Sequence, residues 1–159
     1  MKRMGDVGLA VIIIGVIAIV LSAAVIIFSA NVQSRIPLNI GDGVFTAKLA
    51  NTPSLRAGAV SGVTDLSNNQ ALIMAYPSDS KWTVSVSDIK TSMDIVWIDS
   101  NKKIVYIVTN ASPDNTMSSV FAPKSDARYV VILPAGSTDN LNIKSGRSAV
   151  FDLGGTAVQ

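Results

Sequence analysis

The feature that most constrains this chain is a stretch without charged residues that runs from Val7 to Ser34. Its centre, Leu9 to Phe28, is almost purely aliphatic. An α-helix rises about 1.5 Å per residue, so a helix over this centre spans roughly 30 Å, the thickness of the hydrocarbon core of a bilayer. The sequence therefore predicts a transmembrane helix at residues 7–30 that contacts the lipid bilayer through residues 9–28.

The charges that flank this stretch predict its orientation. Lys2 and Arg3 precede it and are opposed only by Asp6, whereas Arg35 is the one nearby cation on the far side. By the positive-inside rule, residues 1–6 are expected in the cytoplasm and the rest of the chain outside it. The predicted location is the cell membrane, which the chain crosses once.

A cleaved signal peptide is the alternative to an uncleaved anchor. Signal peptides have apolar cores of about 7–15 residues and small residues before the cleavage site. Here the apolar core is longer, and Phe28 would stand three residues before a cut that follows Ala30. An uncleaved signal anchor is therefore the favoured interpretation.

Three residue types are absent from the chain: cysteine, histidine and glutamate. Their absence excludes a Ser-His-Asp triad, a cysteine nucleophile and an ordinary zinc site. Beyond Ser34 the chain carries eleven Lys and Arg against ten Asp, so it offers no basic surface for nucleic acid. We expect no nucleic-acid partner, no metal and no cofactor, and a binding module is favoured over an enzyme.

After the apolar stretch, the sequence predicts a linker at residues 31–37, a β-rich domain at 38–153 and a tail at 154–159. Thr52 and Pro53 predict one short helix that runs to about Val60. The expected fold is α+β, mostly β: a small barrel- or sandwich-like domain with one short helix. Strand character, with turns at 41–43 and 99–102, is found in Leu38–Ile40, Val44–Leu49, Ala71–Tyr76, Trp82–Val86, Ile95–Ile98, Lys103–Val108, Tyr129–Leu133 and Ser148–Leu153.

The order of these segments resembles the domain of unknown function 192 family over roughly residues 38–153. Asn51–Gly58 is similar to the family's opening helix, in which an arginine is followed closely by glycine, and Met93–Asp99 is similar to its central strand. The resemblance implies a small prokaryotic domain and no established reaction. The other similar segments are Lys103–Val108, Ala127–Val130 with Ala135–Gly136, and Ile143–Gly146.

This chain departs from the family pattern at two polar positions. Val84–Asp88 stands where the family usually has Phe-Trp-Met-Lys-Asn, so the lysine and asparagine are lost. Arg147 replaces the acid that usually follows the closing glycine. The polar cluster that would be the first candidate for a family site is therefore expected to be largely absent.

Asp94 is the strongest single candidate for a polar site because it keeps a family position. It cannot form a dyad with Asp99, since side chains five residues apart on one strand point to opposite faces. Asp88 is a candidate to join Asp94 across the turn at residues 90–92, around a hard cation. The favoured interpretation is that Asp94 and Asp99 simply border turns.

Ser87 and Trp82 complete the candidate ligand-binding residues. Ser87 begins a Ser-x-x-Lys sequence, the nucleophile motif of penicillin-binding enzymes, but its companion motifs are missing and a solvated loop is favoured. Trp82, Trp97 and Tyr106 are candidates to line a groove for a sugar or peptide. Packing in the core is the favoured interpretation of these aromatic residues.

The leading hypothesis is a non-enzymatic module of the cell envelope that binds a ligand or protein partner while tethered to the membrane. One alternative is a small envelope enzyme that acts on carbohydrate or peptide through Asp94. Another is a structural, homo-oligomeric surface protein, for which Ala18 and Ser22 supply a small-xxx-small pair on the predicted helix.

Overall fold

The computed structural model describes residues 12–19, 34–61, 63, 66–112 and 119–159. The chain divides into two units, at residues 1–32 and 33–159. In the first unit, residues 12–19 are helical and their isoleucine and valine side chains are exposed. Within the described residues, no helix is both long enough and apolar enough to cross a bilayer. The remainder of the predicted membrane segment, the predicted cytoplasmic residues 1–6 and the start of the predicted linker lie outside the described residues.

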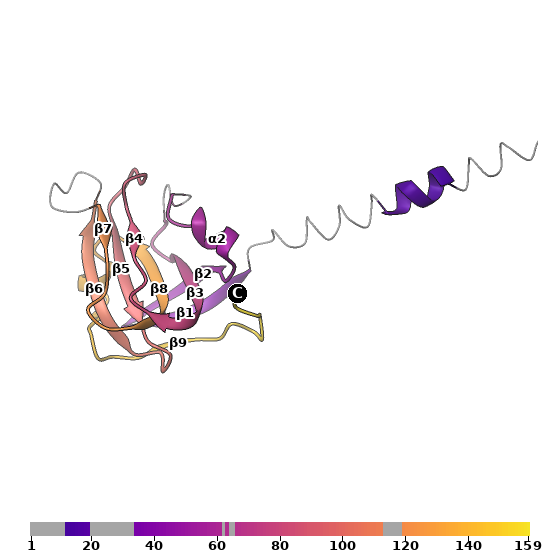
Figure 1. Ribbon diagram of the computed structural model, residues 1–159. Helices are drawn as coiled ribbons and strands as arrows, with labels where there is room; N and C mark the ends of the chain where they lie inside the picture. Colours follow the sequence, from indigo (N-terminus) through magenta and orange to yellow (C-terminus); the bar gives the residue numbers. More distant parts are fainter. Residues whose placement is uncertain (1–11, 20–33, 62, 64–65, 113–118) are drawn as a thin grey trace, which may run out of the picture. The chain divides into compact units, whose positions relative to one another are not determined.

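The second unit is built on one curled sheet. In its described part, seven strands pair in the order β6-β5-β8-β3-β2-β1-β9 (Figure 1). The start of β6 approaches β9 through a bridge between Lys103 and Ser148, so the sheet curls into a half-barrel. The strands are β1 (Arg35–Ile40), β2 (Gly43–Ala50), β3 (Gln70–Ser80), β5 (Met93–Ile98), β6 (Ile104–Ala111), β8 (Ala127–Pro134) and β9 (Ala149–Phe151). A separate short pair consists of β4 (Val84–Ser85) and β7 (Val120–Phe121).

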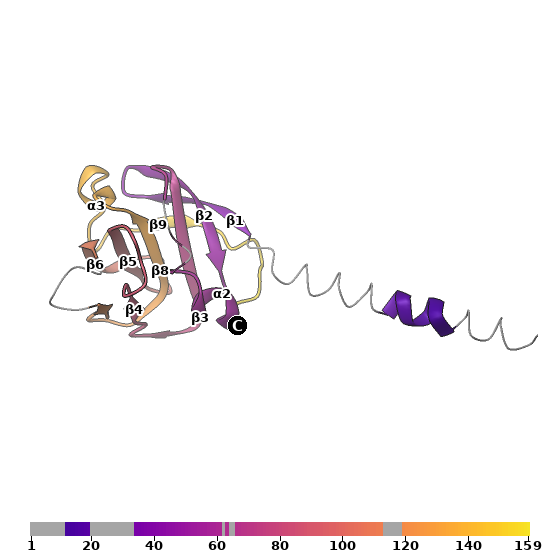
Figure 2. The same ribbon diagram turned by 90° about the horizontal axis from the view of Figure 1, so that it is seen from above.

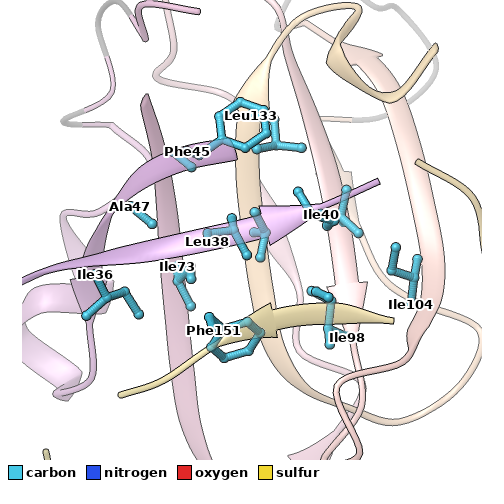
Figure 3. Packing of buried hydrophobic residues seen from close by; sticks show 14 of the residues in the cluster. Ile36, Leu38, Ile40, Phe45, Ala47, Ile73, Ile98, Ile104, Leu133 and Phe151 are labelled. Carbon is cyan, nitrogen blue, oxygen red and sulfur yellow. The ribbon is translucent and has the colours of Figure 1, made fainter. Parts of the chain in front are cut away.

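Apolar side chains cover both faces of this sheet. Along β3, Ala71, Ile73 and Ala75 belong to one buried cluster, whereas Leu72 and Met74 belong to the other, as the alternation of a strand requires. The first cluster fills the inside of the curl, where side chains from β1, β2, β8 and β9 meet (Figure 3). The central strand β5 is buried along its whole length, which agrees with the continuous apolar run Ile95–Ile98.

Two short helices flank the sheet in the described residues, at opposite ends of the domain (Figure 2). The predicted helix is α2 (Pro53–Ala57), which ends earlier than the predicted Val60 because turns follow Ala57. The prediction of a single helix was wrong, because α3 (Ser137–Asn140) is a second one. Its four residues are too few to show a helical period in sequence.

The predicted linker is partly wrong as well. Residues 35–37 belong to β1, where Pro37 lies opposite Thr46 of β2. Strand β9 pairs only with Leu38–Ile40, so the Pro37 end of β1 is an edge of the sheet. Proline is tolerated at such an edge because no neighbour requires its missing N–H group.

Candidate ligand-binding groove

A groove of about 170 Å³ lies between α2, β3 and the segment around β4, and we call it the Arg56 groove. This volume is well above the roughly 10–15 Å³ that one water requires and below the about 300–1,000 Å³ of drug-sized sites. The groove therefore suits a small ligand. Its lining residues are Arg56, Ala57, Val60, Ser61, Met74, Tyr76, Thr83, Val84, Ser85, Asp88 and Ile89.

The connection between β2 and β3 places Arg56 at the groove. These two strands are parallel, so the chain must cross over between them, and α2 lies in that crossover. Thr52 caps α2, as predicted, by accepting a hydrogen bond of 3.3 Å from the Leu55 N–H. Pro53 occupies the first turn, where its missing N–H costs nothing. Arg56 follows in the last turn of the helix.

The Arg56 guanidinium is held by three neighbours. Its Nη1 donates to the Ala75 carbonyl at 2.7 Å, and its Nη2 donates to the Gln159 carbonyl at 2.6 Å. Its central carbon lies 4.8 Å from the centre of the Tyr76 ring, a cation–π contact. The arginine is thus fixed in position while it remains half-buried at the groove.

Two stacked aromatic rings support Arg56. The rings of Tyr76 and Trp82 lie 4.1 Å apart and are nearly parallel, with an angle of 9° between them. Two hydrogen bonds hold Trp82. Its indole Nε1 donates to the Ser78 carbonyl, and its main-chain carbonyl accepts from Trp97 Nε1 at 2.8 Å. Burial raises the pKa of Tyr76 above its usual value, and the nearby Arg56 charge partly opposes that rise.

Three of the four predicted site residues lie at or beside this groove. Asp88 lines it directly, and Trp82 stacks on Tyr76, which lines it. Ser87 is exposed in a turn, and its hydroxyl lies 3.0 Å from the hydroxyl of Ser85, another lining residue. No helix begins at Ser87, so it lacks the setting of a Ser-x-x-Lys nucleophile.

Asp94 is placed elsewhere. Its side chain is completely buried on β5, and its carboxylate accepts three hydrogen bonds: from the Asn110 N–H at 2.9 Å, from the Thr138 N–H at 2.8 Å and from the Thr138 hydroxyl at 2.7 Å. It does not line the Arg56 groove with Asp88. Within the described residues, no three acidic side chains come together as a group able to hold a metal ion.

The three aromatic residues that were candidates to line one groove also lie in different places. Trp97 is fully buried, which confirms its predicted core role, and the half-buried Tyr106 packs against it with 5.5 Å between ring centres. Sequence reasoning did not name Arg56 or Tyr76 as site residues. The available indication was the arginine in a capped helix between two strands, but only the parallel pairing of β2 with β3 brings Tyr76 beneath it.

The opposite charges in the groove do not neutralise each other. Among the described residues, the ion pairs are Arg128 with Asp79 at 2.7 Å and Arg147 with Asp42 at 3.8 Å. Neither pair includes Arg56 or Asp88. Arg56 and Asp88 therefore line one small groove as separate charges.

Comparison with known proteins identifies relatives of this domain. The family model DUF192, described as "Uncharacterized ACR", matches residues 36–151. A curated relative, a UPF0127 protein of Thermococcus gammatolerans, is 27% identical over 87 residues, which are 54% of this chain and 54% of the relative. The chain thus spans about half the length of the curated relative that it matches.

Two solved structures share the fold. One, provisionally described as a transcription regulator from Sinorhizobium meliloti 1021, has a TM-score of 0.69 and 17% identity, and the alignment covers 75% of this chain and 95% of the other. The second is a protein of unknown function from Novosphingobium aromaticivorans DSM 12444, with a TM-score of 0.65, 18% identity, and coverage of 74% of this chain and 84% of the other. Likeness at these identities shows the fold alone.

Proposed function

We propose, on the premise that this chain belongs to the DUF192 family of uncharacterized proteins, that its β-rich domain is a non-enzymatic module that binds a small zwitterionic ligand in the Arg56 groove. The observation that carries the proposal is the presence of Arg56 and Asp88 as separate opposite charges in one small groove. A ligand with a carboxylate and an ammonium group would pair with both.

The chemistry of the groove supports this ligand class. Arginine presents a planar fork of donors that matches a carboxylate, and Asp88 is an acceptor for an ammonium group. Val60, a half-buried lining residue, offers an apolar surface to the short carbon skeleton between the two charges. The hydroxyl groups of Thr83 and Ser85 add donors and acceptors at the same groove.

Binding without turnover is the favoured activity. The chain lacks histidine and cysteine, the side chains that most often act as bases and nucleophiles near neutral pH. The alternative of an enzyme acting through Asp94 has no comparable support, because that carboxylate is fully buried and accepts three internal hydrogen bonds.

The test measures the affinity of glycine for the full chain in detergent micelles. Saturation-transfer NMR detects the binding. Acetate and methylammonium serve as probes that carry one of the two charges each. We expect glycine to bind at least tenfold more tightly than either single-charge probe. We also expect Arg56→Lys and Asp88→Asn each to weaken glycine binding about tenfold. Lysine cannot present the planar fork of donors, asparagine carries no charge, and a charge-assisted hydrogen bond contributes about 1.4 kcal/mol or more.

Two exposed residues provide matched controls. Arg35→Lys and Asp126→Asn make the same chemical changes at surface positions away from the groove lining, and they are expected to leave glycine binding unchanged. Equal affinity for the three probes, or glycine binding that survives both groove substitutions, would rule out the proposed ligand class.

We further propose that the domain is tethered to the cell membrane by residues 9–28 and works outside the cytoplasm. The support is the uncharged aliphatic stretch and the cations that precede it. A tether of this kind would keep the binding domain at the membrane surface.

A further inference from the structure

The last residues of the chain fold back against the domain. Gly154 and Gly155 both have a positive φ, of 63° and 71°, which L side chains rarely adopt. A turn bond from the Thr156 N–H to the Leu153 carbonyl, of 3.1 Å, reverses the chain after the sheet. Residues 157–159 therefore return toward Asn51 and Arg56 instead of continuing away.

Three hydrogen bonds hold this segment, and each one uses its main chain. Asn51 Nδ2 donates to the Ala157 carbonyl at 2.6 Å, and the Gln159 N–H donates to the Asn51 carbonyl at 2.9 Å. Arg56 Nη2 donates to the Gln159 carbonyl at 2.6 Å. Val158, which lies between Ala157 and Gln159, packs against the apolar cluster inside the curl of the sheet. Asn51 and Arg56 thus hold an extended segment by its backbone and one apolar side chain.

The family match includes the residues that hold the segment but not the segment itself. Asn51 and Arg56 lie within residues 36–151, the part of the chain that matches the family, whereas residues 157–159 lie beyond it. Arg56 also takes part in two sites at once. One of its terminal nitrogens donates to the Ala75 carbonyl, and the other donates to the segment.

We propose that Asn51 and Arg56 form a seat for an extended peptide segment, that residues 157–159 fill this seat from within the chain, and that their departure frees a terminal nitrogen of Arg56, so that a ligand binds more tightly in the groove. The second part rests on the proposed function, whereas the first part stands on the hydrogen bonds alone. The partner is an extended peptide with one apolar side chain between two positions that are held through the main chain.

Tethering explains why the segment occupies the seat. A short flexible link gives the attached end an effective concentration in the millimolar range. A free peptide at lower concentration therefore cannot displace it from the intact chain. Removal of the segment should expose the seat to a free peptide of the same sequence.

The experiment compares the intact chain with a chain that ends at Thr156, both in detergent micelles. The probe is a synthetic tetrapeptide with the sequence of residues 156–159, and its binding is measured by saturation-transfer NMR. We expect the shortened chain to bind the peptide and the intact chain to bind it at least tenfold more weakly, because the attached segment competes at a millimolar effective concentration. Arg56→Lys in the shortened chain should weaken peptide binding, and the matched control Arg35→Lys should not.

A second form keeps the test decisive if the shortened chain does not fold. A protease site inserted between Gly155 and Thr156 allows the segment to be cut and dialysed away after folding, with near-ultraviolet circular dichroism as the check of tertiary structure. If the folded, cut chain does not bind the peptide, the seat is disproved. If it binds the peptide but its affinity for glycine is unchanged, the seat stands and its coupling to the groove is disproved.

Discussion

Among the described residues, Tyr76 has a pKa that its surroundings clearly shift. Burial against α2 and β4 disfavours its phenolate, which raises its pKa above the ordinary value of about 10, and the Arg56 charge opposes part of that rise. The neutral hydroxyl is therefore favoured by the folded state, while the unfolded chain releases the proton near pH 10.

The direction of the resulting pH dependence follows from proton binding. Between pH 10 and the folded pKa, the unfolded state binds fewer protons, so the contribution of Tyr76 to stability is complete below pH 10 and declines as the pH rises. The slope is at most about 1.4 kcal/mol per pH unit. Urea unfolding between pH 8 and 11 should show this decline in the parent and not in Tyr76→Phe.

A direct measurement complements the unfolding curves. Arg56→Gln removes the opposing charge, so the absorbance titration of Tyr76 at 295 nm should shift to higher pH. Lys48→Gln, at an exposed position on β2, is the matched control and should leave the titration unchanged. A shift of Tyr76 to lower pH in Arg56→Gln would contradict the proposed effect of Arg56.

At the scale of elements, Asp94 joins three segments that are distant in sequence. It lies on β5 and accepts hydrogen bonds from Asn110 at the end of β6 and from Thr138 on α3. Asn110 has a positive φ of 50°, so the Asp94 carboxylate also stabilises an uncommon backbone conformation. The helix α3, which has four residues, depends on such external contacts because a helix this short is not stable alone.

We therefore predict that Asp94→Asn destabilises the domain by about 2–4 kcal/mol. The amide keeps one acceptor but turns an N–H group toward a buried donor, so at least one charge-assisted hydrogen bond is lost and a donor is left unpaired. Urea denaturation measures the loss, and Asp126→Asn, at an exposed position, should change stability by less than about 0.5 kcal/mol. Full stability together with lost ligand binding would instead indicate a direct role in a site.

The sequence predicted the strands better than the site. Continuous apolar runs identified β5 and β8, and the Thr52-Pro53 pair identified the start of α2, because these signals are local. The pairing of β2 with β3 is not local, since Ala47 and Ala71 are partners that lie far apart in the chain. Arg56, Tyr76 and Asp88 line one groove only in the folded chain, so the sequence named Asp88, Ser87 and Trp82 as candidates but not Arg56.

Asp94 shows the opposite limitation. Its position within a family motif marked it as a polar residue of importance, and the structure gives it a complete set of internal partners. The sequence could not distinguish a buried carboxylate that links elements from one that faces a ligand, because Thr138 is far from it in the chain and belongs to a helix too short to predict.

At the scale of the whole molecule, the proposed tether makes a prediction about location. The full chain should remain with membranes after alkaline carbonate extraction, because residues 9–28 are uncharged over a length that matches a bilayer. Replacement of Val16 and Ile17 by arginine should release it, since each charge at the bilayer centre costs about 2.5–3.5 kcal/mol.

The orientation has its own measurement. Protease added to right-side-out vesicles should remove the β-rich domain, whereas inverted vesicles should protect it.

The carbonate extraction has a matched control. Val44→Arg with Val150→Arg changes two exposed positions in the second unit and should leave membrane association intact. Release of the parent protein by carbonate would contradict the tether.

The single parallel strand pair among the described strands also has a consequence for the order of events during folding. The hairpins β1–β2 and β5–β6 join neighbouring segments, so they can form early, whereas the contact between β2 and β3 requires closure of the whole crossover that carries α2. Arg56 reaches Tyr76 only after that closure. A newly made chain would therefore acquire most of its strands before its groove, and the groove would be among the last features of the domain to mature.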